Sequence, residues 1–144
     1  GGDMLNGGAG SDLIEGREGN DSIDGGPGSD TITGGPGSDR FIFSHLSLPG
    51  EPLDFITDFN AGQDTLVLPV DAFAGLAPWA GQRIGPPNPV IAQDPGTGVV
   101  SYDPDGEFGP AFQPVPILLV APVPGGAWML GETSIYVAPS LTPT

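Results

Sequence analysis

Polar and apolar positions recur every nine residues over the first 43 residues of the chain. An apolar residue stands at the eighth place of each copy, at Leu5, Ile14, Ile23, Ile32 and Phe41. An aspartate stands two places earlier, at Asp3, Asp12, Asp21, Asp30 and Asp39. The copies read GREGNDSID, GGPGSDTIT and GGPGSDRFI in succession, with glycine favoured at places one, two and four. Two residue classes that keep one phase over five copies indicate a structural repeat.

Each nine-residue copy predicts a tight turn followed by a short strand. Glycine permits backbone angles closed to other residues, so the six residues up to the aspartate can turn with their carbonyl groups pointing inward. The next three residues form a minimal strand whose apolar residue faces one side. Two copies then make one coil of a flattened parallel solenoid. Residues 1–43 are predicted to form about two and a half coils of it.

After residue 43 the pattern changes to short β-prone runs separated by turn signals. DFITDFNAGQDTLVLPV predicts strands at residues 55–57 and 65–68, and VVSY, PILLV and SIYV predict three more. Turns are predicted at residues 94–96 and 103–106, and only residues 70–76 suggest a helical period. The prolines at 114, 116, 122 and 124 favour edge strands or covering segments. We therefore predict an all-β fold in two parts, a repeat solenoid over residues 1–43 and a β-rich cap over residues 44–144.

Composition narrows the classes of function. The 144 residues hold eighteen acidic and three basic side chains, a formal net charge of −15, which repels nucleic acid and anionic lipid and attracts cations. Cysteine is absent, which removes disulfide, zinc-thiolate and redox sites. No apolar run approaches the ~20 residues of a membrane span, and GGDMLN at the start has no signal-peptide pattern. Since the chain starts inside a repeat, any such signal is expected further upstream.

The aspartates predict a metal. In the solenoid Asp3, Asp21 and Asp39 stack along one edge, and Asp12 and Asp30 along the other. At a coil spacing of about 4.8 Å two carboxylates repel by about 1 kcal/mol in water, and more at a protein surface. A divalent cation between stacked turns replaces this repulsion by attraction and coordinates the carbonyl oxygens of the turns. A set of six or more oxygen ligands is the preference of Ca²⁺.

We expect one calcium ion in each of three spaces between stacked aspartates. The expected ligands are the aspartates and turn residues of the repeats: Asp3, Gly7, Ala9, Asp12, Gly16, Glu18, Asp21, Gly25, Pro27, Asp30, Gly34, Pro36 and Asp39. A second oxygen-rich cluster follows at Asp54, Asp58, Asn60 and Asp64. It predicts either solvated turns or a further calcium site that ties the roll to its cap, in which Asp58 is the preferred ligand.

These motifs resemble a known family. GGAGSDLIE, GGPGSDTIT and GGPGSDRFI are similar to the calcium-binding nonapeptides of the RTX (repeats-in-toxin) family. DFITDFNAGQDTLVLP resembles the segment that closes the β-roll in serralysin-type proteases and alginate epimerase R-modules, and GVVSYDPDGEFG resembles a hairpin of the same C-terminal modules.

The resemblance implies a right-handed parallel β-roll, export by a type I ABC transporter that reads an uncleaved C-terminal signal, and folding triggered by calcium outside the cell. Two features depart from the family. Arg17 replaces the second glycine of its copy and is expected to weaken or distort that turn, and VAPSLTPT is unlike a compact apolar terminus.

Catalytic motifs are missing from the sequence. His45 is the only histidine and has no cysteine, lysine or GxSxG motif to act with. The residues after Asp103 lack the glutamate of an EF-hand, and the Asp-Pro bonds at 94–95 and 103–104, which resemble self-cleavage sites, are interpreted as turns. Any catalytic domain is expected upstream of Gly1.

Two classes of function remain open. One is a secreted module that folds on calcium and supports type I secretion and stability of a larger protein. The other is a calcium-dependent adhesion, polysaccharide-binding or self-assembly module of a cell-surface protein or extracellular enzyme. Three arginines are too few for a face that recognises an anionic polysaccharide, whereas calcium-bridged contact with an anionic surface or another copy is compatible with the charge.

Overall fold

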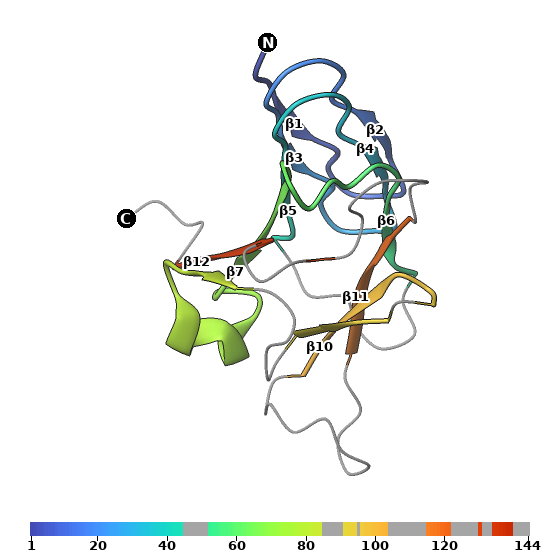
Figure 1. Ribbon diagram of the computed structural model, residues 1–144. Helices are drawn as coiled ribbons and strands as arrows, with labels where there is room; N and C mark the ends of the chain where they lie inside the picture. The colour runs from blue at the N-terminus through green and yellow to red at the C-terminus, as the bar shows by residue number, and fades with distance from the viewer. Residues whose placement is uncertain are drawn as a thin grey trace.

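The computed structural model describes residues 1–44, 52–84, 91–94, 96–103, 115–121, 130 and 134–139. These residues form short strands and one 3-10 helix (Figure 1). The strands are β1 (Met4–Asn6), β2 (Leu13–Glu15), β3 (Ser22–Asp24), β4 (Thr31–Thr33), β5 (Arg40–Ile42), β6 (Asp54–Ile56), β7 (Thr65–Pro69), β8 (Arg83–Ile84), β9 (Ile91–Gln93), β10 (Val99–Tyr102), β11 (Val115–Val120) and β12 (Ile135–Ala138), and the helix is η1 (Ala74–Trp79).

Alternate strands of the repeats belong to two different sheets. One sheet has the order β1-β3-β5-β7-β12-β8 and the other β2-β4-β6-β11-β10-β9. The pairs are parallel from β1 to β12 in the first sheet and from β2 to β11 in the second, and only the strands beyond them pair antiparallel. The all-β prediction and the parallel β-roll are confirmed.

The coil length changes where the repeats end. Met4 pairs with Ser22 and Leu13 with Thr31, so the first coils contain eighteen residues. The next coil places Thr31 against Phe55, and hydrogen bonds across this step join residues 24 and 25 apart in sequence. Both sheets thus run across residue 43, and the division of the chain at that residue stays a proposal.

The apolar residues at the eighth places form one core between the sheets. Ile23, Ile32 and Phe41 are 0%, 1% and 0% exposed, and Ile14 is buried with them, as predicted. Leu5, in the first strand, is half-buried and packs against the same core. The side chains that flank them point outward, and Leu13 is 73% exposed although it is apolar. Position within the nonapeptide therefore decides burial more strongly than residue type.

The cap contains the predicted strands in all five β-prone runs, at β6, β7, β10, β11 and β12. The helical segment lies slightly later than predicted, at Ala74–Trp79. Where a turn is predicted at residues 94–96, the Asp94 carboxylate accepts a hydrogen bond of 2.7 Å from the N–H of Gly96. His45, the turn after Asp103 and the last five residues lie outside the described residues.

The prediction that Pro116 marks an edge strand is wrong. Its strand, β11, lies between β6 and β10 in the sheet. The proline is tolerated because β6 pairs only with Leu118–Val120 further along the strand. On the other side Pro116 lies opposite Ser101, where the register shifts by a β-bulge.

Candidate calcium site

The aspartates of one edge are joined in a column by hydrogen bonds. Oδ1 of Asp21 accepts from the backbone N–H of Asp3 at 2.7 Å, and Oδ1 of Asp39 accepts from the N–H of Asp21 at 2.9 Å. The column then continues into the cap, because Oδ1 of Asp64 accepts from the N–H of Asp39 at 3.0 Å. Each carboxylate thus lies against the turn of the coil before it.

The other edge contains a second column. Oδ1 of Asp30 accepts from the N–H of Asp12 at 2.8 Å, and Oδ1 of Asp54 accepts from the N–H of Asp30 at 2.9 Å. We call the space between two consecutive aspartates of one column an interval. The two columns together have five intervals, three in the first and two in the second.

Sequence reasoning counted only three intervals. It placed Asp54 and Asp64 in a separate cluster, although both continue the columns. The sequence contains a pattern that marks both aspartates as members of the columns. Each is followed two places later by a buried apolar residue, Ile56 or Leu66, which is the second half of the nonapeptide without its glycine-rich first half.

The second carboxylate oxygen is buried without a partner at several of these aspartates. Within the described residues, Oδ2 of Asp12, Asp21 and Asp39 is buried and accepts no hydrogen bond. Asp21 and Asp39 are each only 1% exposed. A buried carboxylate oxygen without a donor is costly unless a cation or a proton compensates it.

Burial also changes the acidity of this column. It raises the pKa of Asp39, against the effect of the N–H that Asp21 donates and with the nearby charges of Asp21 and Asp58 adding to the rise. Burial raises the pKa of Asp64 to about 6, while the N–H groups of Asp39 and Asn60 oppose the shift. The fold therefore disfavours the ionised forms of Asp39 and Asp64 unless a cation compensates them, as expected of a site built for a cation.

The first glycine of each copy provides space for the aspartate. A Cβ placed on Gly7 would lie 2.8 Å from Oδ2 of Asp12 and 2.7 Å from the carbonyl oxygen of Gly25 in the next coil. A Cβ on Gly16 would likewise lie 2.6 Å from Oδ2 of Asp21 and 2.5 Å from the carbonyl oxygen of Gly34. Neither glycine has a positive φ, so close approach excludes a side chain there. Predicted ligand oxygens from neighbouring coils thus lie close together.

The second glycine is needed for its backbone angle. Gly8, Gly26 and Gly35 have φ values of 86°, 85° and 94°. Arg17 occupies the same place and adopts φ of 76°. The turn is therefore not distorted, and the substitution is accommodated by strain of about 1–2 kcal/mol, the usual cost of a left-handed conformation for a residue with a Cβ.

The side chain at the third place of each nonapeptide faces solvent. Ala9, Glu18, Pro27 and Pro36 are all exposed, and their backbone carbonyls are the predicted ligands. The carbonyl oxygens of Pro27 and Pro36 accept hydrogen bonds from the N–H groups of Gly10 and Gly19, at 2.9 and 3.1 Å. A carbonyl has a second lone pair, so this pairing leaves each oxygen able to bind a metal.

Asp58 closes the last glycine-rich turn. Its Oδ1 accepts from the N–H of Gly34 at 2.9 Å and its Oδ2 from the N–H of Gly35 at 2.7 Å. In the preceding coil the N–H of Gly16 bonds instead to the backbone carbonyl of Thr33. The side chain of Asp58 thus replaces a backbone acceptor, and its role as a calcium ligand stays a prediction.

The oxygen set fits calcium. Within the described ranges, no three acidic, histidine or cysteine side chains gather as a metal cluster. A cation held between the turns would take backbone carbonyl oxygens together with the carboxylates of the columns. Calcium accepts six to eight such oxygens in a flexible geometry, whereas Mg²⁺ requires a strict octahedron and Zn²⁺ prefers nitrogen and sulfur.

The first repeats match a known family in sequence. Residues 1–32 match the sequence model of the family described as RTX calcium-binding nonapeptide repeat (4 copies). The match covers less than a quarter of the chain, and the structure continues the coils of these repeats to Phe41 and beyond. The Ca²⁺ that such repeats bind is the ion that the two aspartate columns fit.

Among solved structures, the chain is similar to the AlgE6R3 subunit from the Azotobacter vinelandii Mannuronan C5-epimerase, determined in solution. The two sequences are 26% identical, the match covers 70% of this chain and 61% of that subunit, and the TM-score is 0.41. No curated protein sequence matches the chain. None of the helices in the described part of the chain has the length and apolar character needed to cross a bilayer.

Proposed function

We propose that this chain is the calcium-dependent folding and export module of a larger secreted protein. It remains unfolded in the calcium-poor cytosol, passes through a type I ABC transporter, and folds when calcium fills the intervals outside the cell. The catalytic or binding activity of the larger protein lies in another of its parts. The observation that supports this most strongly is the buried, unpartnered Oδ2 of Asp21 and Asp39 between stacked turns.

The energetics favour a fold that depends on calcium. Each repeat strand buries one apolar residue, while ordering the backbone costs about 1–2 kcal/mol per residue. At ~10⁻³ M calcium, a site with a dissociation constant of ~10⁻⁴ M adds about 1.4 kcal/mol to the folded state. Five filled intervals would add about 7 kcal/mol, which is the stability of an ordinary domain. Calcium can therefore decide whether the roll folds.

The cap has a specific part in this proposal. We assign residues 1–43 to the roll and residues 44–144 to the cap, with Asp54 and Asp64 as the cap's contribution to the last interval of each column. In this proposal strands β6 and β7 of the cap offer free edges, and the last repeat strands, β4 and β5, pair with them. Folding is expected to begin at the cap and to proceed toward residue 1.

Circular dichroism and two-dimensional NMR of the whole chain test the calcium step. In excess chelator the repeat residues are expected to give the narrow amide shifts of a disordered chain, and ~10⁻³ M calcium should disperse them cooperatively. Magnesium at the same concentration is the control and should have little effect. Dispersed repeat resonances in chelator would contradict the proposal.

Export is tested separately in cells that carry a type I transporter. The chain fused behind a reporter should appear in the medium, and deletion of its last residues should retain the fusion inside the cells. Sedimentation velocity in calcium distinguishes this function from self-assembly, since an export module is expected to remain monomeric. Release without the transporter would argue against the export role while leaving calcium folding intact.

A further inference from the structure

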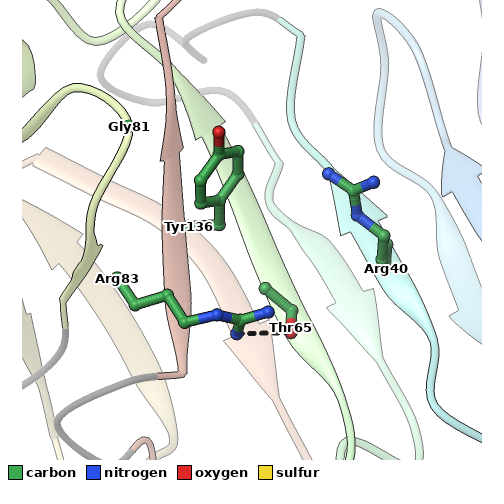
Figure 2. Close-up of a pocket in the computed structure, with 5 residues that line it drawn as sticks. All are labelled: Arg40, Thr65, Gly81, Arg83 and Tyr136. Carbon is green, nitrogen blue, oxygen red and sulfur yellow. Dashed lines mark hydrogen bonds between the residues drawn. The ribbon is translucent and has the colours of Figure 1, made fainter.

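A hollow of about 570 Å³ lies on the first sheet, beside the end of the first aspartate column. Figure 2 shows the five described residues that line it, which are Arg40, Thr65, Gly81, Arg83 and Tyr136. They come from β5, β7, β12 and β8, which are neighbours in the sheet, and from the residues just before β8. Its volume is within the range of small-molecule sites.

This hollow concentrates positive charge in a very acidic protein. It contains two of the three basic residues of a chain whose net charge is −15. No carboxylate is among its described lining residues. Arg40 is exposed, forms no ion pair within the described residues, and places its guanidinium carbon 6.0 Å from the ring centre of Tyr136. Arg83 donates from Nη1 to the hydroxyl of Thr65 at 3.1 Å.

Strand register brings these residues together. Arg40 pairs with Thr65 across β5 and β7, and Arg83 pairs with Tyr136 across β8 and β12. Their side chains therefore face one side of the sheet. Figure 2 shows the guanidinium group of Arg83 at Thr65 and that of Arg40 over its own strand, on the side toward the ring of Tyr136. Sequence reasoning found three arginines too few for an anion-recognition face, but it had no means to place two of them at one hollow.

We propose that this hollow binds a carboxylate carried on a sugar-sized ring. A guanidinium group offers two parallel donors that match a carboxylate, and Arg40 is positioned to provide them. The Thr65 hydroxyl and Arg83 border the same space, and the ring of Tyr136 provides a flat surface for the body of the ligand. A monoanion is favoured over a phosphate dianion because the surrounding charge of −15 repels the second charge more.

Calcium should control this site through two effects. Arg40 and Thr65 directly follow Asp39 and Asp64, so an ion in the interval between those aspartates fixes the register of the strands that build the hollow. Five bound divalent ions would also reduce the net charge from −15 to −5, which lowers the repulsion of an anion. The inference rests on the calcium-bound fold and not on export.

Titration of the calcium-loaded chain by NMR or calorimetry tests the proposal. The probes are glucuronate, glucose as its neutral counterpart, and inorganic phosphate as the dianion. Glucuronate is expected to bind most strongly, to shift the amides around Tyr136, and to bind undetectably in chelator. Equal responses to glucose, or stronger binding of phosphate, would overturn the assigned ligand class.

Variants separate the hollow from general charge effects. Arg40→Gln is expected to weaken glucuronate binding about tenfold or more, as loss of a charged hydrogen-bonding partner does. Arg17→Gln makes the same change in net charge outside the hollow and should alter binding less than about twofold. Their calcium midpoints, measured by circular dichroism, verify that both fold. Equal weakening by both variants, or no weakening by Arg40→Gln, would show that diffuse charge or direct bridging by calcium binds the anion.

Discussion

Replacement of Asp39 by Asn is expected to have opposite effects with and without calcium. Asp39 is 1% exposed, belongs to two intervals, and has one oxygen that accepts from the N–H of Asp21 and one that is unpartnered. Asparagine is nearly the same size and retains the acceptor, but it removes the charge. In chelator, where the repeats of the parent chain are expected to be disordered, the variant should be no less folded than the parent, because burial raises the pKa of Asp39 and disfavours its ionised form.

In calcium the same variant should be much less stable. With calcium at about 100 times its dissociation constant, each filled site contributes about 2.7 kcal/mol. Loss of two sites would therefore reduce the stability of the calcium-bound fold by up to about 5 kcal/mol. The calcium midpoint should move to a higher concentration, and the transition should become less cooperative because each ion joins two coils.

Calcium titration by circular dichroism and urea unfolding at fixed calcium measure both effects. The matched control is Asp24→Asn. It removes the same charge from a repeat of the first sheet, at a position outside the columns. Asparagine there retains the Oδ1 that accepts from the N–H of Gly26. Asp12→Asn, which touches one interval, should fall between the two. A calcium midpoint of the Asp39 variant that is no higher than that of the Asp24 variant would refute the metal-based reasoning.

Three further predictions follow from burial, backbone angle and acidity. Ile23→Asp should abolish the calcium-induced change in circular dichroism because Ile23 is 0% exposed, whereas Leu13→Asp, at a position 73% exposed, should retain it. Arg17→Gly should lower the calcium midpoint, since it relieves about 1–2 kcal/mol of strain at φ of 76° against a smaller entropic cost of glycine; an unchanged or higher midpoint would contradict this. In calcium-free solution the stability should fall as the pH rises from about 4 through 6, because Asp64 has its pKa raised to about 6 and the folded chain binds more protons than the unfolded one. Circular dichroism measures the folded fraction, and a calcium-free chain that is no more folded at pH 5 than at pH 7.5 would contradict this prediction.

Local features of this protein could be read from the nonapeptide alone. A turn, a three-residue strand and one inward apolar side chain are set by contacts within nine residues, so the burial of Ile23 and Ile32 and the stacking of the repeat aspartates follow from spacing. The choice of calcium follows from the ligand chemistry in the same way. Sequence spacing is sufficient here because each coil repeats the contacts of the last.

Tertiary structure decided the features that depend on which distant strands pair. Asp54 and Asp64 join the columns only because a coil of 24 or 25 residues returns to the same edge as the coils of eighteen. Pro116 can occupy an inner strand because β6 pairs with β11 only after this proline, and β10 has a bulge opposite it. Arg40 and Tyr136 meet because β12 adds beside β7 in the first sheet. No periodicity marks these pairings, since their strands are separated by segments of unequal length, and only the packed core selects among the registers that local sequence allows.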